Sequence, residues 1–168
     1  CIATGFLNEA KKVYNYLDLI WEQQPNFPNE LYYNFSRKNQ KIIKSVDKQD
    51  DFWNVVIAQQ DSYQRWTVGG IAAAFLCRLY LTDPKEKYLN LAVKYMTFSM
   101  ASTKSQFKYA SACKSGWGSA LLYSVTGEEK YLNWTEKLAQ WFIEHQLEDG
   151  SWSMNKLGKN EPDSDSSK

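Results

Sequence analysis

Histidine, cysteine and net charge are all scarce in this sequence. It contains one histidine and three cysteines in 168 residues, and twenty basic and nineteen acidic side chains leave a net charge of +1. The cysteines are Cys1, Cys77 and Cys113, and their spacing fits no metal site, so we expect no metal and no other cofactor. Because binding to phosphates needs a basic surface, we also expect no nucleic-acid partner.

Long apolar runs are missing as well. The longest, residues 68–77, is too short to cross a bilayer, and the mean hydropathy is −0.57. With 43% hydrophobic and 23% charged residues, the composition is that of an ordinary globular domain with its own core. We therefore predict no transmembrane segment, one domain over residues 1–154 and a polar tail or linker at 155–168.

The ends of the chain and its sequons bear on where the protein works. The chain starts at Cys1 rather than at Met and ends in a run of Asp and Ser, which is typical of a piece processed from a longer protein. This sequence shows no signal peptide, although a mature chain would have lost one. The cytoplasm is slightly favoured as the location. Asn34 and Asn133 lie in glycosylation sequons, which would fit a secreted protein instead.

Aromatic residues, in contrast, are abundant. They make up 15% of the chain, with seven Trp and eleven Tyr. Such rings fill hydrophobic cores, and they also line pockets for sugars, polyenes and flat ligands. We expect most of them to lie in the core and a minority to line a pocket.

An internal repeat indicates the architecture. The pentapeptide Glu-Lys-Tyr-Leu-Asn occurs at residues 86–90 and again at 129–133, 43 residues further on. Each copy follows an apolar segment rich in small residues and opens an amphipathic one. A period of this length fits a unit of two helices. The predicted fold class is therefore all-α, with helical hairpins arranged in two layers.

Three amphipathic segments are predicted to form the outer layer. Their apolar faces are Phe6, Ala10, Val13, Leu17 and Ile20 in residues 6–24, then Tyr88, Leu91, Ala92, Tyr95 and Phe98, and finally Tyr131, Trp134, Leu138, Trp141 and His145. We expect Asp83 to cap the second of these helices, with Pro84 at its first position.

Two apolar segments, residues 67–81 and 116–123, are predicted to form inner helices buried on every side. Gly69 and Gly70 would let neighbouring helices approach closely, and Cys77 would be a buried, reduced thiol. Between the first outer helix and the first inner helix, residues 31–35 and 41–46 are expected to pair as a short β-hairpin across residues 37–40.

The end of the third amphipathic segment resembles the QW motif of terpenoid cyclases. Gln146, Gly150 and Trp152 stand at the spacing of that motif after an aromatic helix end. In physical terms, the Gln would bind backbone at the helix end, the Gly would form the turn and the Trp would pack back on the hairpin.

Together with the two-layer repeat, this motif makes the chain similar to the α/α-toroid superfamily. That group includes squalene-cyclase-like proteins, protein prenyltransferase β-subunits and, by architecture, (α/α)6 sugar-active enzymes. A complete toroid has more helices than this chain can form, so the resemblance implies part of one. Either the rest of a longer chain or a homodimer completes it, or the chain forms an open arc.

The acidic motifs of those enzymes are absent from this sequence. The run at residues 47–51 does not match the Asp-x-Asp-Asp acid of class II cyclases, and Asn54 stands where the magnesium motif Asp-Asp-x-x-Asp ends in Asp. A single histidine, His145, makes the zinc set of prenyltransferases implausible. The resemblance thus implies a shape and no metal, and we interpret His145 as a helix-end residue.

Candidate site residues come from where inner helices begin, because in such toroids those ends point into the central cavity. Asp61, Tyr63 and Lys114 are the catalytic candidates, as acid, base and carbonyl-polarising or anion-holding group. The candidates for substrate binding are Arg65, Trp66, Tyr109 and Trp117. In the alternative interpretation, Asp61 caps a helix, the cations are solvated and the Trp side chains belong to the core.

Three functions remain open on this basis. The first is a cofactor-free cyclase or isomerase that acts on a hydrophobic, terpenoid- or polyketide-like molecule in an aromatic-lined cavity. The second is a carbohydrate-active (α/α)6 enzyme, namely a glycosidase, lyase or epimerase, which would need two carboxylates facing one cleft. The third is a non-catalytic helical-repeat scaffold that binds its ligand on a concave face.

Overall fold

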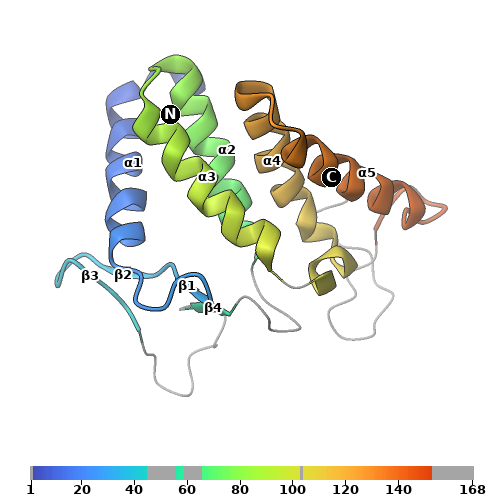
Figure 1. Ribbon diagram of the computed structural model, residues 1–168, viewed down its shortest axis with the longest axis horizontal. Helices are drawn as coiled ribbons and strands as arrows, with labels where there is room; N and C mark the ends of the chain where they lie inside the picture. The colour runs from blue at the N-terminus through green and yellow to red at the C-terminus, as the bar shows by residue number, and fades with distance from the viewer. Residues whose placement is uncertain (1, 45–55, 59–65, 103, 153–168) are drawn as a thin grey trace.

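The computed structural model describes residues 2–44, 56–58, 66–102 and 104–152, and these residues form an all-α fold with a small amount of β structure (Figure 1). Its α-helices are α1 (Leu7–Glu22), α2 (Thr67–Thr82), α3 (Glu86–Ala101), α4 (Cys113–Thr126) and α5 (Glu129–Glu144). Its 3-10 helices are η1 (Ile2–Thr4), η3 (Lys104–Lys108) and η4 (Ala110–Ala112). The predicted all-α class is confirmed.

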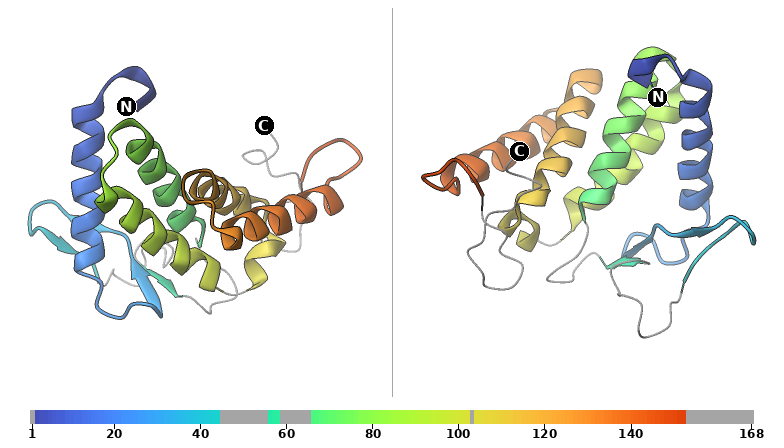
Figure 2. Two further views of the ribbon diagram at one scale, coloured as in Figure 1. Left: turned by 45° about the horizontal axis from the view of Figure 1, so that its top comes forward. Right: turned by 180° about the vertical axis from the view of Figure 1, so that it is seen from behind.

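The helices form two layers of hairpins. The inner helices α2 and α4 pack on each other, while α3 packs on α2 and α5 packs on α4. Helix α3 lies in front of α2 in Figure 1 and behind it in the reversed view of Figure 2. None of the helices in the described residues has the length and apolar character needed to cross a membrane.

Glycines set how closely the inner helices approach. A Cβ atom added at Gly70 would lie 2.5 Å from the Cα of Ser115, and one added at Gly118 would lie 2.9 Å from the Cα of Gly70. On the other side of α2, a Cβ at Gly69 would collide with the backbone of Tyr95. The predicted close approach is confirmed, and it requires glycine at these three positions.

The inner helices are nevertheless not buried on every side, so this part of the prediction is wrong. Ile71 on α2 is 41% exposed and Trp117 on α4 is 45% exposed. The guanidinium carbon of Arg78 lies 5.6 Å from the centroid of the Trp117 ring. The two helices share this open face because no described element covers it. Cys77 lies on a buried side of α2, where burial raises the pKa of its thiol to about 12.

The buried face of α1 also differs from the prediction. Phe6 and Val13 are exposed, and the buried residues of this helix are Ala10, Tyr14 and Ile20. Tyr14 takes the central place because its ring packs edge-on against Tyr88 of α3, with 4.7 Å between ring centroids. The polar hydroxyl of Tyr14 is satisfied there by donating to Asp18 Oδ2 at 2.9 Å. A polar aromatic residue thus fills the position that an apolar pattern assigns to valine.

Asp83 does not cap α3, contrary to the sequence prediction. It follows the last turn of α2, where its N–H donates to Leu79 O at 2.9 Å, and α3 begins at Glu86. The carboxylate pairs with Lys11 at 2.9 Å and Lys85 at 3.3 Å, and it accepts a hydrogen bond from Tyr88 Oη at 3.3 Å. Asp83 therefore links α1, α2 and α3, and the hydrogen bond from Lys11 holds the pKa of its carboxyl below the usual value.

Four short strands follow α1 and form two antiparallel pairs. Strands β2 (Phe35–Ser36) and β3 (Lys41–Ile42) pair across residues 37–40, which confirms a hairpin at this place. The predicted partners differ in part, because Leu31 and Tyr32 pair with another strand and residues 45–46 lie outside the described residues. Strand β1 (Glu30–Tyr32) pairs with β4 (Val56–Ala58). Gln24 joins α1 to β1, because its side-chain amide donates to Tyr32 O and accepts from Tyr32 N, both at 2.8 Å.

Candidate functional site: a pocket between α3 and α5

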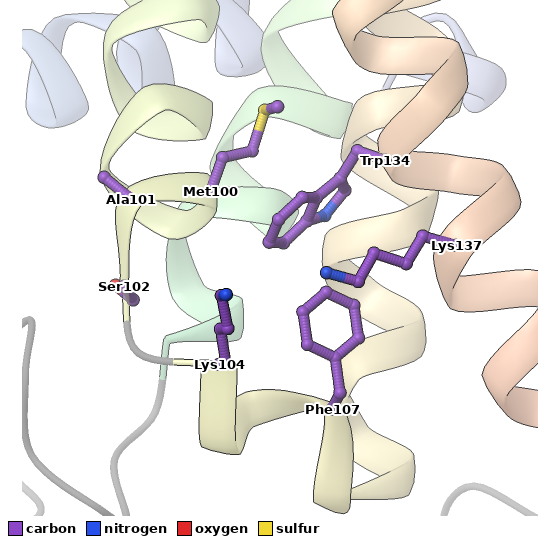
Figure 3. Close-up of a pocket in the computed structure, with 7 residues that line it drawn as sticks. All are labelled: Met100, Ala101, Ser102, Lys104, Phe107, Trp134 and Lys137. Carbon is purple, nitrogen blue, oxygen red and sulfur yellow. The ribbon is translucent and has the colours of Figure 1, made fainter.

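A pocket of about 470 Å³ lies between the end of α3, the short helix η3 and one face of α5 (Figure 3). It is lined by Met100, Ala101, Ser102, Lys104, Phe107, Trp134 and Lys137. Ligand pockets of small molecules have volumes of roughly 300–1,000 Å³ and combine apolar walls with a few polar groups. This pocket has both properties, and we refer to it as the α3–α5 pocket.

One wall of the pocket is positioned by a buried glutamine. The side-chain amide of Gln106 donates to the carbonyls of Ser99 and Ser102, each at 3.1 Å. These bonds tie η3 to the last turn of α3. They thereby place Phe107 and Lys104 beside the pocket, and Phe107 itself is buried.

The opposite wall comes from α5. The indole N–H of Trp134 donates to Ser115 Oγ of α4 at 3.1 Å, which fixes the ring in its orientation. The rings of Trp134 and Phe107 meet with centroids 5.1 Å apart. Lys137, three residues further along α5, places its Nζ atom 4.2 Å from the centroid of the Phe107 ring. A cation over an aromatic face at this distance is held by the ring quadrupole.

The pocket carries positive charge without a compensating carboxylate. Figure 3 shows the side chains of Lys104 and Lys137 reaching from different elements toward the same space. Among the described residues that line the pocket there is no Asp or Glu, and the ion pairs of the described chain involve other lysines. The site can therefore offer an apolar, aromatic surface next to two ammonium groups.

The residues proposed from sequence lie elsewhere. Asp61, Tyr63 and Arg65 fall outside the described residues. Trp66 is only 2% exposed and packs in the core, with its ring centroid 6.0 Å from that of Tyr109. The structure thus brings Trp66 and Tyr109 together and buries the indole of Trp66.

Lys114 and Trp117 lie near the start of α4, and Trp117 belongs to the open face that α4 shares with α2. Neither residue lines the α3–α5 pocket. The pocket residues were missed in the sequence, although Trp134 stands on the predicted stripe of α5 and Lys137 follows it by three residues. The pocket depends on η3, and no periodic pattern in the sequence predicts that this short 3-10 helix lies beside α5.

The QW-like turn agrees with its physical interpretation at Gly150 and Trp152, whereas Gln146 binds the backbone of the turn rather than that of the helix end. Gln146 Nε2 donates to Gly150 O at 2.8 Å, and Gly150 has a φ of +84°, which favours glycine. Trp152 donates from its indole nitrogen to Phe142 O at 2.8 Å and packs edge-on against the Phe142 ring. His145 is exposed at the helix end with Nδ1 2.9 Å from Trp141 O, which agrees with its interpretation as a helix-end residue.

Comparison with known proteins finds no relative of this chain. No family model matches this chain, and no curated protein and no solved structure matches it either. Within the described residues, no three His, Cys, Asp or Glu side chains gather closely enough to hold a metal ion. The resemblance to the α/α toroids therefore stays a prediction.

Proposed function

We propose that this protein binds an apolar small molecule in the α3–α5 pocket, on an α/α-hairpin scaffold of the toroid kind. The observation that carries the proposal is the aromatic and thioether surface formed by Phe107, Trp134 and Met100 beside a space of about 470 Å³. Its aromatic walls are anchored from two sides, through Gln106 on η3 and Ser115 on α4. A preformed pocket of this kind reduces the ordering that a ligand must impose.

A second candidate function is a cofactor-free cyclase or isomerase whose reacting site lies at the starts of the inner helices rather than in the α3–α5 pocket. It is favoured by the QW-like turn, in which Gln146 donates to Gly150 O and Trp152 donates to Phe142 O. Asp61, Tyr63 and Lys114 remain the proposed acid, base and polarising groups. The carbohydrate alternative has less support, because the described lining of the pocket offers no pair of carboxylates.

A fluorescence titration of the full chain with the neutral probe N-phenyl-1-naphthylamine tests the binding proposal. We expect saturable binding at one site. Ala101→Trp should abolish it, because the indole would fill the pocket from an exposed position at the end of α3. Ala139→Trp is the matched control, since Ala139 is also exposed on a helix but lies outside the pocket. Unsaturable binding, or equal effects of the two substitutions, would contradict the proposal.

A turnover assay separates binding from catalysis. Lys114→Met should leave binding of the neutral probe unchanged, because Lys114 does not line the pocket. If the protein also cyclises or isomerises a terpenoid- or polyketide-like molecule, this variant and Asp61→Asn should lose that turnover while keeping their circular dichroism spectra. Unchanged turnover in both variants would remove these residues from the catalytic role.

A further inference from the structure

Lys137 is held along the wall of the pocket by its aromatic neighbours. Its Nζ atom lies 4.2 Å from the centroid of the Phe107 ring and 6.0 Å from that of the Trp134 ring. Lys137 and Trp134 stand three residues apart on α5, so they share one face of that helix. The ammonium group is thus placed at the ring surface on which an apolar ligand would pack.

Lys104 brings a second ammonium group from η3 (Figure 3). Two like charges that converge on one space repel each other, and an anion between them relieves that repulsion. A ligand with a negative group would therefore gain from both lysines at once. A neutral ligand of the same shape would leave the repulsion in place.

Other lysines of this chain show what happens when a carboxylate is at hand. Lys11 and Lys85 both pair with Asp83, and Lys130 pairs with Glu128 at 2.6 Å. Within the described residues, Lys104 and Lys137 have no such partner, although both point toward the same pocket. The pocket is therefore a place where two ammonium groups converge with no carboxylate among the described lining residues.

We infer that the α3–α5 pocket selects a molecule with one compact anionic group, a carboxylate, sulfonate or phosphate, attached to an apolar or aromatic body. Lys137 and Lys104 hold the anion, while Phe107, Trp134 and Met100 contact the body. The flexible thioether of Met100 lets the wall adapt to bodies of different shape. This inference rests on the proposed function and specifies the class of its ligand.

Two probes of nearly the same shape separate charge recognition from apolar binding. 8-Anilinonaphthalene-1-sulfonate carries a sulfonate on the ring system of N-phenyl-1-naphthylamine, which has none. The wild-type chain should bind the sulfonate about tenfold more tightly than the neutral probe, because each lysine adds about threefold when it pairs with an anion at a partly exposed site. Rising salt concentration should reduce this preference, since mobile ions screen exposed charges.

Substitutions assign the preference to particular lysines. Lys137→Met and Lys104→Met should each weaken binding of the sulfonate about threefold and leave binding of the neutral probe unchanged. Lys137→Arg should retain the preference, because it retains the charge. Lys94→Met is the matched control, since Lys94 also lies near an aromatic ring, that of Trp21 at 6.0 Å, but outside the pocket.

The outcomes distinguish this inference from the proposed function. If both probes bind equally well, or if Lys94→Met weakens the sulfonate as much as Lys137→Met does, the anion selectivity is wrong and the apolar pocket stands. If neither probe binds, the proposed function and this inference fall together. Displacement of the sulfonate by 1-naphthoate or by 1-naphthyl phosphate identifies the preferred anion, whereas equal displacement by naphthalene would overturn the inference.

Discussion

The hairpins α2–α3 and α4–α5 open their outer helices with the same pentapeptide, yet the two outer helices are buried to very different extents. Helix α3 has seven buried residues, whereas α5 has two, Tyr131 and Leu138. Helix α3 lies against α1 as well as α2, with Tyr95 Oη donating to Leu17 O at 2.9 Å. Among the described elements, α5 packs chiefly on α4. The same motif thus starts the same kind of helix, and the number of neighbours decides how firmly it is held.

The start of each outer helix shows the difference at one residue. In the first hairpin, Asp83 accepts a hydrogen bond from the hydroxyl of Tyr88. In the second, the equivalent Tyr131 is fully buried, and its hydroxyl has no hydrogen-bond partner among the described residues. The connection there consists of Gly127, which has a φ of +69° and no side chain, and Glu128, whose carboxylate pairs with Lys130 at 2.6 Å. The repeat thus keeps the tyrosine ring at this position but not the carboxylate that accepts its hydrogen bond.

The α3–α5 pocket lies where these two hairpins diverge. The more firmly packed helix α3 supplies one wall, and the less buried α5 supplies Trp134 and Lys137. Regions with fewer buried contacts open more readily, and binding sites are often found in them. The comparison therefore predicts a stable first hairpin, a weaker second one and a ligand site at their junction.

The largest effect is expected where the two hairpins cross. Gly118→Val would force a side chain into the backbone of Gly70, and we expect it to destabilise the fold by at least about 3 kcal/mol. Gly116→Ala is the control, because its added methyl would meet only the side chain of Leu138, at 3.4 Å. Urea denaturation followed by circular dichroism measures both. A Gly118→Val protein as stable as the wild type would show that the crossing is not close.

Truncating one buried leucine in each outer helix compares the two hairpins directly. Leu91→Ala in α3 should cost about 3–4 kcal/mol, and Leu138→Ala in α5 about 2 kcal/mol. Both residues are equally buried, but Leu138 belongs to a small cluster with Phe107 and Ala112, while Leu91 lies in the main core. The free energy of unfolding in urea measures the difference, and a larger loss in α5 would reverse the proposed order.

Removing the hydroxyl of Tyr88 should lower the stability of the fold, whereas removing that of Tyr131 should not. Tyr88→Phe removes a hydroxyl that is bonded to Asp83 and should cost about 1 kcal/mol. Tyr131→Phe removes a buried hydroxyl that bonds to no described residue, so it should leave the stability unchanged or raise it slightly. Thermal unfolding of both variants gives the result. An equal loss in the two would indicate that Tyr131 also has a partner.

The smallest effect concerns pH. Because the folded state lowers the pKa of Asp83, the carboxylate stabilises the fold above its unfolded-state pKa of about 3.9. That stabilisation is lost as the pH falls through the lower folded-state pKa. Asp83→Asn should therefore be less stable than the wild type at neutral pH, with the difference disappearing in acid. A difference that persists at pH 2 would assign the effect to something other than the charge.

Much of the fold follows from local patterns in the sequence. The 43-residue repeat predicts the hairpins, and Gly69 and Gly70 predict the close approach of the inner helices. The sequence fails where the outcome depends on tertiary partners. Asp83 beside Pro84 is a good helix cap by local rules, but its carboxylate instead binds Lys11 and Tyr88. The open face at Ile71 and Trp117 likewise depends on which helices cover it.

The site was harder to predict than the fold. The resemblance to toroids predicts a site at the starts of the inner helices, which include Lys114 and Trp117. The α3–α5 pocket instead depends on η3, which Gln106 holds against the end of α3 through two backbone carbonyls. Such a contact joins residues that no periodic pattern relates. Only the folded arrangement places Phe107 beside Trp134.

The most direct test follows the indole N–H signals of Trp134 and Trp117 by NMR during titration with N-phenyl-1-naphthylamine. Trp134→Phe and Trp117→Phe variants assign the two signals. If the α3–α5 pocket is the ligand site, the Trp134 signal shifts in proportion to the bound fraction and the Trp117 signal stays in place. A shift of Trp117 without a shift of Trp134 would contradict the account and would move the site to the open face of α2 and α4.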